Sequence, residues 1–373
     1  NNFIYSDLGK DTTVIYNSRT GALATLKEEQ SRQLDEFLTS GREIEDKDFL
    51  DKLVQCGYLL PAEVDEPFLI RQTLMHSRYN TRVFSLTIAP TMACNFRCIY
   101  CFEKGRYGKG QMDDETVGNV IEFIKGRLRG IDTLHISWYG GEPLLAMSVI
   151  ETISKAVIPL CEANDVLYDA SIITNGYLYT KQVAERLKEY QVKRVQITLD
   201  GPKETHDARR PLVNGGSTYD VILNNLIAAK GILPVSIRVN VDVDSIDMVN
   251  DIVQFLREQQ LLESCYPYLA PVIPYNKAYE EERCLSSERY SSYNLQFLLD
   301  NQIPLQSIYP KPRGNYCIAD SSSGWVIDDR GDIYKCWNEI ADTNKSVGNV
   351  NRGRDYLQHT YVLEQFLGFD PTL

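Results

Sequence analysis

Short apolar, β-branched runs alternate with helical patterns through the middle of the chain. Six such runs predict strands, at 83–89, 133–138, 168–173, 194–199, 235–241 and 266–273. Between them, apolar residues recur with helical spacing near 114–128, 147–163, 181–190, 219–230 and 246–258. Repeated strand–helix steps indicate the α/β class, with a parallel sheet that curls into a partial, TIM-like (β/α)6 barrel. Functional side chains are then expected at the carboxyl ends of the strands.

The first 80 residues follow a different pattern and predict a small α+β module. Hairpin-like segments at Thr12–Tyr16 and Ala22–Leu26 flank a turn, and helical patterns follow near 27–38 and 46–55. Elements of this size fit a winged-helix-like module. Winged helices that grip DNA present basic faces, whereas residues 26–66 hold twelve acids and five bases. The negative charge favours a module that recognises a peptide, and a solvated cap over the next domain is the alternative.

After about residue 302 the strand–helix pattern gives way to a segment rich in Pro, Gly and Ser. A hairpin signal lies within it at 328–331. We therefore predict three units: a small N-terminal module with its linker over 1–80, a core barrel over 81–300, and a smaller module over 301–373.

The composition fits a soluble protein with a large core. The 373 residues are 43% hydrophobic and 24% charged, and the formal net charge of -12 would repel a nucleic-acid backbone. No run approaches the roughly 18 uninterrupted apolar residues that cross a bilayer, and residues 1–13 lack a basic and then apolar signal pattern. We therefore predict a cytoplasmic protein that binds neither nucleic acid nor membrane.

Three of the nine cysteines crowd into eight residues: Cys94, Cys98 and Cys101. This spacing indicates ligation rather than cross-linking, and a reducing compartment keeps such thiols free. On one loop after the first barrel strand, three thiolates can ligate three corners of an iron–sulfur cube and leave the fourth iron open. Structural zinc is the alternative, but it normally requires a fourth ligand, and His76 and His135 lie on other predicted elements.

Four further cysteines stand alone in the sequence: Cys56, Cys161, Cys265 and Cys284. None of them suggests a ligand motif, so we interpret all four as ordinary buried thiols. Two of them, Cys265 and Cys284, are expected near the mouth of the barrel.

The spacing Cys94-x3-Cys98-x2-Cys101, with the aromatic Tyr100 before the last cysteine, resembles the signature loop of radical S-adenosylmethionine (SAM) enzymes. Further matches follow later strands in family order: Gly140-Gly141-Glu142-Pro143, Thr174-Asn175-Gly176 and Leu199-Asp200-Gly201-Pro202. Together they cover residues 82 to about 273. The resemblance implies a 4Fe–4S cluster that binds SAM at its open iron and cleaves it to a 5′-deoxyadenosyl radical, which removes hydrogen from an unactivated carbon.

The same resemblance implies cofactor contacts at the strand ends, beside Tyr100. Residues 140–143 match the site for the methionyl amino group of SAM, where the glycines let backbone carbonyls approach and Glu142 adds a charge. Asn175 and Thr198 are expected to contact SAM. Two basic residues are candidates for its carboxylate, with ordinary surface or interstrand pairing as the alternative: Arg210 and Arg238.

The last segment resembles the opening of a SPASM domain, an extension that binds auxiliary iron–sulfur clusters in peptide maturases. The resemblance rests on Cys317 and on Cys336, which ends the segment Gly331-Asp332-Ile333-Tyr334-Lys335-Cys336. In that family the other ligands form a cysteine block downstream, after a segment like 366–371, whereas no cysteine follows Cys336 here. Since two thiolates cannot hold a cube, we expect the remaining ligands to be missing from the sequence. A reduced domain or two ordinary thiols are the alternatives.

Two reactions fit this resemblance. In the first, the N-terminal module holds the leader of a ribosomally made precursor peptide, and the barrel cross-links the peptide, most simply as a cysteine thioether. A flavodoxin or ferredoxin would supply electrons. The second is anaerobic sulfatase maturation, which oxidises Ser or Cys to formylglycine; there an Asp follows the cysteine that matches Cys336, where this chain has Trp337, with Glu339 as a substitute. A binding module that holds structural zinc is the non-catalytic alternative.

Overall fold

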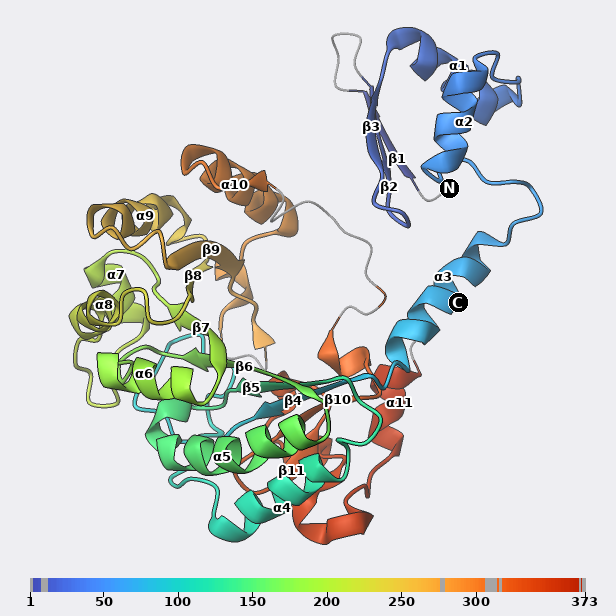
Figure 1. Ribbon diagram of the computed structural model, residues 1–373. Coiled ribbons are helices and arrows are strands. Elements are labelled where there is room, and N and C mark those ends of the chain that lie inside the picture. The colour runs from blue at the N-terminus through green and yellow to red at the C-terminus, as the bar shows by residue number, and fades with distance from the viewer. Residues whose placement is uncertain are drawn as a thin grey trace. The chain divides into compact units, whose positions relative to one another are not determined.

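The computed structural model describes residues 3–7, 13–275, 279–305, 314, 317–368 and 370. The chain forms two compact units (Figure 1). The first comprises residues 1–78, 305–316 and 370–373, and the second comprises residues 79–304 and 317–369. The three clustered cysteines belong to the second unit.

The N-terminal unit combines a three-stranded antiparallel sheet with three helices. Its strands, in sheet order, are β1 (Phe3–Asp7), β2 (Thr13–Asn17) and β3 (Leu23–Leu26), and its helices are α1 (Glu28–Ser40), α2 (Lys47–Gln55) and α3 (Glu66–Arg78). Apolar residues of the sheet, α1 and α2 form a separate core: Ile15, Leu26, Leu34, Phe49 and Leu53. The predicted hairpin and first two helices are confirmed, except that Thr12 lies outside the described residues. The sequence pattern does not predict β1 or α3.

Capping residues set where several helices begin and end. Asp46 accepts a hydrogen bond from the backbone N–H of Phe49 at 3.1 Å and starts α2. Asp113 does the same for the N–H of Thr116 at 2.8 Å, before α4 (Asp114–Lys125). α1 ends at Gly41, whose φ of 73° lies in the left-handed region that favours glycine.

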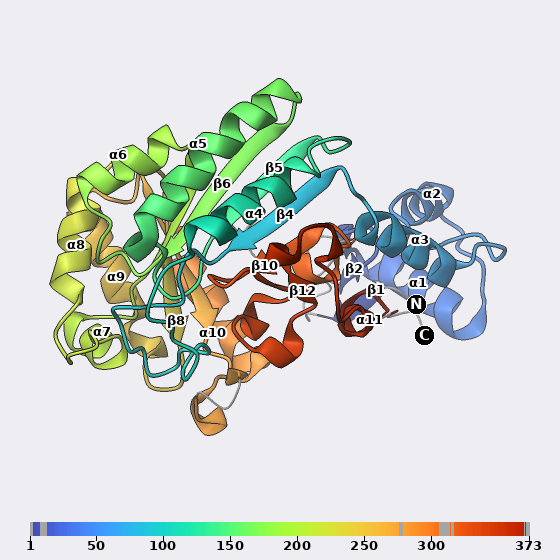
Figure 2. The ribbon, with the colours of Figure 1, turned by 90° about the horizontal axis from the view of Figure 1, so that it is seen from below.

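Six parallel strands that follow one another in chain order form the centre of the second unit (Figure 2). They are β4 (Val83–Ile88), β5 (Thr133–Trp138), β6 (Leu167–Thr174), β7 (Val192–Thr198), β8 (Val235–Val241) and β9 (Cys265–Pro271). Helices α4, α5 (Met147–Ala163), α6 (Lys181–Glu189), α8 (Tyr219–Ala228) and α9 (Val249–Glu258) cover the outside of this sheet. The predicted α/β fold with a partial barrel is confirmed.

Two helices between the first barrel strand and residue 300 are not predicted by the sequence pattern. They are α7 (Lys203–Arg209), which follows β7, and α10 (Ser287–Asp300), which follows β9. α7 is short, and two of its polar side chains, His206 and Arg209, are buried. A buried polar face gives no apolar periodicity, which explains why the pattern misses it.

One helical segment, Pro143–Ala163, is long and apolar enough by composition to cross a membrane. It consists of a 3-10 turn (Pro143–Ala146) followed by α5. Its inward residues Val149, Ile150, Ile153 and Val157 are buried in the core of the barrel unit. Its apolar character is therefore accounted for by packing in the barrel.

The C-terminal segment extends the barrel sheet. β10 (Gly324–Ile327) pairs in parallel with β4, β11 (Asp332–Tyr334) pairs antiparallel with β10, and β12 (Gly348–Asn349) pairs with β11. The predicted hairpin at 328–331 is confirmed, with Gly331 at a φ of 81°. Helix α11 (Tyr361–Leu367) follows. The parallel pairing of β10 with β4 brings residues next to Cys336 to the barrel mouth.

Candidate functional site

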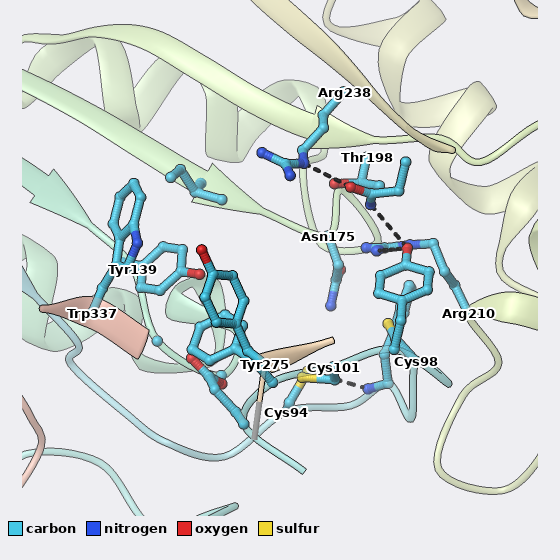
Figure 3. Close-up of a pocket in the computed structure, with 18 of the residues that line it drawn as sticks. Cys94, Cys98, Cys101, Tyr139, Asn175, Thr198, Arg210, Arg238, Tyr275 and Trp337 are labelled. Carbon is cyan, nitrogen blue, oxygen red and sulfur yellow. Dashed lines mark hydrogen bonds between the residues drawn. The ribbon is translucent and has the colours of Figure 1, made fainter. Parts of the chain in front are cut away.

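A cavity of about 340 Å³ lies at the carboxyl ends of the barrel strands. Ten of the predicted site residues line it: Cys94, Cys98, Tyr100, Cys101, Gly140, Gly141, Asn175, Thr198, Arg210 and Arg238. Figure 3 shows the three cysteines on one loop, with Asn175 directly after β6 and with Thr198 and Arg238 on the neighbouring strands β7 and β8. Residues from β4 to β9 thus meet in one place, as expected for a barrel of this kind.

Backbone hydrogen bonds fix the cysteine loop, which follows β4. The N–H of Arg97 donates to the carbonyl of Pro211 at 2.9 Å, and the N–H of Ile99 donates to that of Arg209 at 3.0 Å. Phe96 is buried beneath the loop. The cysteine loop is therefore held by main-chain contacts with the end of α7 and the residues that follow it.

The donor chemistry of the loop fits an iron–sulfur cluster. Burial raises the pKa of Cys94 and of Cys101 to about 12 and also raises that of Cys98, so all three are thiols in the absence of a metal. A metal that replaces their protons turns them into thiolate ligands. No three His, Cys, Asp or Glu side chains already converge on a metal position within the part of the chain that the structure describes. Three soft donors with no histidine favour iron–sulfur over structural zinc.

Gly140 and Gly141 allow the loop after β5 to lie against the chain that leads into the cysteine loop. A Cβ on Gly140, whose φ is 98°, would lie 2.7 Å from the carbonyl oxygen of Thr91. A Cβ on Gly141 would lie 2.3 Å from that of Ala93. Both substitutions would push the two loops apart. The close approach that the glycines permit is between these loops, whereas the sequence predicts an approach to SAM.

Glu142 and Pro143 do not line the cavity, in contrast to the prediction. The fully buried Glu142 carboxyl accepts hydrogen bonds from Thr174 Oγ1 at 2.7 Å, from the N–H of Asn175 at 2.7 Å and from the N–H of Leu144 at 3.0 Å. Burial raises its pKa, and these donors work against that shift. Glu142 therefore connects the loop after β5 to the end of β6, and its predicted contact with the SAM ammonium stays a prediction.

Tyr100 connects the cysteine loop to the ends of β7 and β8. Its hydroxyl donates to Asp200, and it accepts from Arg210 Nη1 at 2.9 Å and from Asn240 Nδ2 at 3.0 Å. Tyr100 and Arg210 are both buried near Cys98, and the guanidinium would be attracted to this sulfur once it is a thiolate. Arg210 Nε has no partner among the described residues. A buried cation with a free donor beside the thiols suits a carboxylate ligand.

Arg238 extends from β8 into the same cavity. Its Nε donates to Asn240 Oδ1 at 2.7 Å, which turns the guanidinium along the strand ends (Figure 3). Asn175 Nδ2 donates to Asn95 Oδ1 at 2.7 Å and so fixes the amide next to the cysteine loop. This side of the cavity offers two cations and neutral hydrogen-bonding groups.

The lining of the cavity also includes residues that the sequence analysis does not predict as site residues. They are one carboxyl and six aromatic or amide groups: Glu103, Phe102, Tyr107, Tyr139, Tyr275, Trp337 and Asn338. Tyr139 directly follows β5, and Trp337 directly follows Cys336. Their place next to a strand end or to a cysteine is a signal that could have identified them.

The remaining cysteines lie outside the cavity. Cys336 is partly buried, and burial, Glu339 and Cys317 together raise its pKa, whereas Cys317 is exposed. Cys265 begins β9 and is therefore at the end of the barrel opposite the cavity, which corrects the expected position at the mouth. Cys56 is exposed, so its interpretation as a buried thiol is wrong. Glu339 does not line the cavity either; its carboxyl lies 3.9 Å from Lys345 Nζ.

The model of the Radical SAM superfamily matches residues 88–256. An uncharacterized protein of Methanocaldococcus jannaschii is 28% identical over 273 residues, which are 71% of this chain and 88% of that protein. A probable GTP 3',8-cyclase of Methanocella arvoryzae is 32% identical over 183 residues, 47% of this chain and 55% of the cyclase. The chain therefore spans about half the length of this cyclase.

Solved structures share the fold. The structure titled anSMEcpe with bound AdoMet has a TM-score of 0.57 and 22% identity, and the match covers 76% of this chain and 77% of that one. SuiB of Streptococcus suis, bound to the precursor peptide SuiA, has a TM-score of 0.56 and 15% identity. The match with SuiB covers 100% of this chain and 88% of SuiB, so it includes the N-terminal unit.

Proposed function

Since this chain is a radical SAM enzyme, we propose that it modifies a ribosomally made precursor peptide and closes a cysteine thioether within it. Cys94, Cys98 and Cys101 hold the 4Fe–4S cluster, and Arg210 or Arg238 pairs with the carboxylate of SAM. When bound, cluster and SAM supply a one-electron cleavage that yields a hydrogen-abstracting radical. The barrel binds and orients the reactants and excludes water and competing hydrogen donors.

The observation that carries this proposal is the N-terminal unit. It has its own apolar core and its own sheet, with β1 and β3 at the edges, so it is more than a loop over the barrel. SuiB, which is matched along the whole of this chain, is described as bound to its precursor peptide. A peptide leader is the ligand that this combination of units favours.

An auxiliary iron–sulfur cluster is part of the proposal. Cys317 and Cys336 lie close enough for the charge of one thiolate to raise the pKa of the other. With further ligands beyond the two, such a cluster would accept the second electron of the reaction. A flavodoxin or ferredoxin is the proposed electron donor, and a cytoplasmic location stays a prediction.

The reaction removes two hydrogens for each link. One C–H and one S–H bond break and one C–S bond forms; a hydrogen atom goes to the SAM-derived radical, and a proton and an electron leave separately. We therefore expect the reconstituted enzyme, given SAM, dithionite and a cysteine-rich peptide encoded beside its gene, to lower the peptide mass by two hydrogens per link. The linked cysteine should resist iodoacetamide. A peptide that keeps all its thiols alkylatable would contradict the proposal.

Sulfatase-type oxidation to formylglycine is the second candidate, favoured by the fold shared with anSMEcpe. The cavity argues against it, because Trp337 and Asn338 line the place next to Cys336 and Glu339 does not. Formylglycine is an aldehyde, so labelling of the product by a hydrazide separates the two reactions.

Unfolding the N-terminal unit should abolish peptide binding and leave the barrel active. Leu53 is buried in the core of that unit, so a Leu53→Asp substitution places an uncompensated charge there, at a cost of several kcal/mol. We expect at least about a ten-fold loss of precursor affinity, with deoxyadenosine formation in the absence of peptide unchanged. Val54→Asp, at an exposed position on the same helix, is the matched control. Equal peptide affinity of the two variants would reject a leader-binding role.

A further inference from the structure

Glu103 is a buried carboxyl that the fold does not use. Its side chain is 3% exposed, it lines the cavity, and Oε1 has no hydrogen-bond partner among the described residues. Glu142, which is also buried, accepts three hydrogen bonds from neighbouring loops. Because burial of a carboxyl without donors is costly, an unpaired carboxyl group in the wall of a cavity indicates a ligand with a hydrogen-bond donor.

The nearest cation does not satisfy Glu103. Arg106 attracts its charge, but the guanidinium is held by other acceptors in the C-terminal segment. Arg106 Nη1 donates to the carbonyls of Asn338 at 3.0 Å and Ile340 at 3.2 Å, and Nη2 lies 3.5 Å from Asp342. Arg106 therefore supplies no hydrogen bond to Glu103, whose Oε1 is buried without a donor among the described residues.

Aromatic rings form the wall next to this carboxyl. The rings of Phe102 and Tyr139 stack at 6.4 Å with an interplanar angle of 11°, and those of Tyr139 and Trp337 stack at 5.2 Å with an angle of 27°. Trp337 is 36% exposed, so the stack extends to solvent. Glu103 and the three rings line the same cavity, and Tyr139 lies within electrostatic range of both Glu103 and Arg238. Aromatic faces beside a carboxylate are the surroundings that bind organic cations.

Charged side chains of both signs line the cavity. Figure 3 shows Arg210 on one side and Tyr139, Trp337 and Tyr275 on the other, and Arg238 lies within electrostatic range of Tyr139. Anionic groups fit the side of Arg210, whereas Glu103 is the only acidic side chain among the described residues that line the cavity. The net charge of -12 also attracts a basic substrate.

We propose that Glu103 and the Phe102–Tyr139–Trp337 stack form a specificity subsite for a basic side chain, lysine or arginine, of the substrate. This proposal rests on the proposed function, since it names a feature of the peptide that the barrel accepts. Glu103 acts here as an acceptor of a charged hydrogen bond, and the rings add cation–π contact. The ammonium group of SAM is another cation that would fit next to Glu103. The experiment below distinguishes binding of SAM from binding of a basic side chain.

The probes are Nα-acetyl-lysine methylamide and its uncharged isostere Nα-acetyl-norleucine methylamide, titrated into SAM-loaded holoenzyme and followed by saturation-transfer NMR. The wild-type protein should bind the lysine probe about ten-fold more tightly. Glu103→Gln, which keeps the shape of the side chain, should lose this preference. Glu339→Gln is the matched control, because Glu339 Oε2 also lacks a partner among the described residues but Glu339 does not line the cavity. It should keep the preference.

Two results would overturn the subsite. One is equal affinity of the wild-type protein for the two probes. This comparison does not depend on whether any variant folds. The other is a Glu103→Gln protein that keeps the preference for lysine, with or without weaker SAM binding; weaker SAM binding would assign the carboxyl to the cofactor. Neither depends on whether a precursor peptide is cross-linked, so failure of the subsite and failure of the proposed function are distinguishable.

Discussion

The Cys98→Ala variant is expected to form no detectable 5′-deoxyadenosine. Cys98 is the middle thiol of the loop, buried next to Arg210 and Tyr100. Two remaining thiols cannot hold a cube whose fourth iron must stay open for SAM. Loss of the cluster therefore removes the chemistry altogether rather than slowing it. The measurement is chromatographic detection of deoxyadenosine after anaerobic reconstitution and reduction with dithionite, together with iron content and visible absorbance.

A second cysteine provides the control for this experiment. Cys284 is partly buried, follows β9 and does not line the cavity, so Cys284→Ala should keep the brown colour and the deoxyadenosine yield of the wild-type protein. A Cys98→Ala protein that is still brown and active would contradict the assignment of Cys98 as a ligand of the 4Fe–4S cluster. Stoichiometric zinc in a colourless wild-type protein would favour the alternative of a structural metal site.

The barrel strands are predictable because each has a buried apolar face. Buried and partly exposed residues alternate along β5 and β6, and the predicted run at 235–241 coincides with β8. The strands of the C-terminal segment give no comparable signal, since β10 to β12 have four, three and two residues. The parallel pairing of Gly324 with Ser85 joins residues far apart in the sequence, and no local pattern encodes it.

The same limit applies to the site: the sequence predicts which residues belong to it, but not which way each side chain points. The spacing of the cysteines identifies their loop because these ligands are neighbours in the sequence. It does not tell where Glu142 points, since the donors that hold its carboxyl include Thr174 and Asn175 on another strand. Glu103 goes unnoticed for the same reason: only the fold shows that its carboxyl is buried and borders the cavity.

The Arg209→Leu variant is expected to lose about 3–5 kcal/mol of unfolding free energy. Arg209 is a buried guanidinium between two fully buried carboxylates, with Nε 3.3 Å from Asp200 and Nη1 bonded to Asp242. Leucine fills part of the space but leaves both carboxylates without this cation. A domain has about 5–15 kcal/mol of stability in total, so this single change would leave the barrel close to unfolding.

The loss should depend on pH. Burial alone would raise the pKa of Asp242, but hydrogen bonds from Tyr279 and Arg209 outweigh it and hold that pKa below its usual value. The stability that the pair contributes is therefore complete above the pKa of an unfolded carboxyl, about 4, and is lost as the pH falls through the lower pKa of the folded state. The difference between wild-type and Arg209→Leu proteins should narrow in acid.

Urea unfolding at neutral pH and in acid measures both effects, with Arg186→Leu as the control. Arg186 pairs with Glu151 at an exposed position, where solvent screens the charges, so its loss should change the stability much less than the loss of Arg209. Arg209→Lys should fall between the two, because an ammonium keeps the charge but cannot bridge both carboxylates and the carbonyl of Asn240. Equal stability of Arg209→Leu and Arg186→Leu would mean that the two aspartates find other partners. In that case Tyr100, which donates to Asp200, would not depend on Arg209 for its place beside the cysteines.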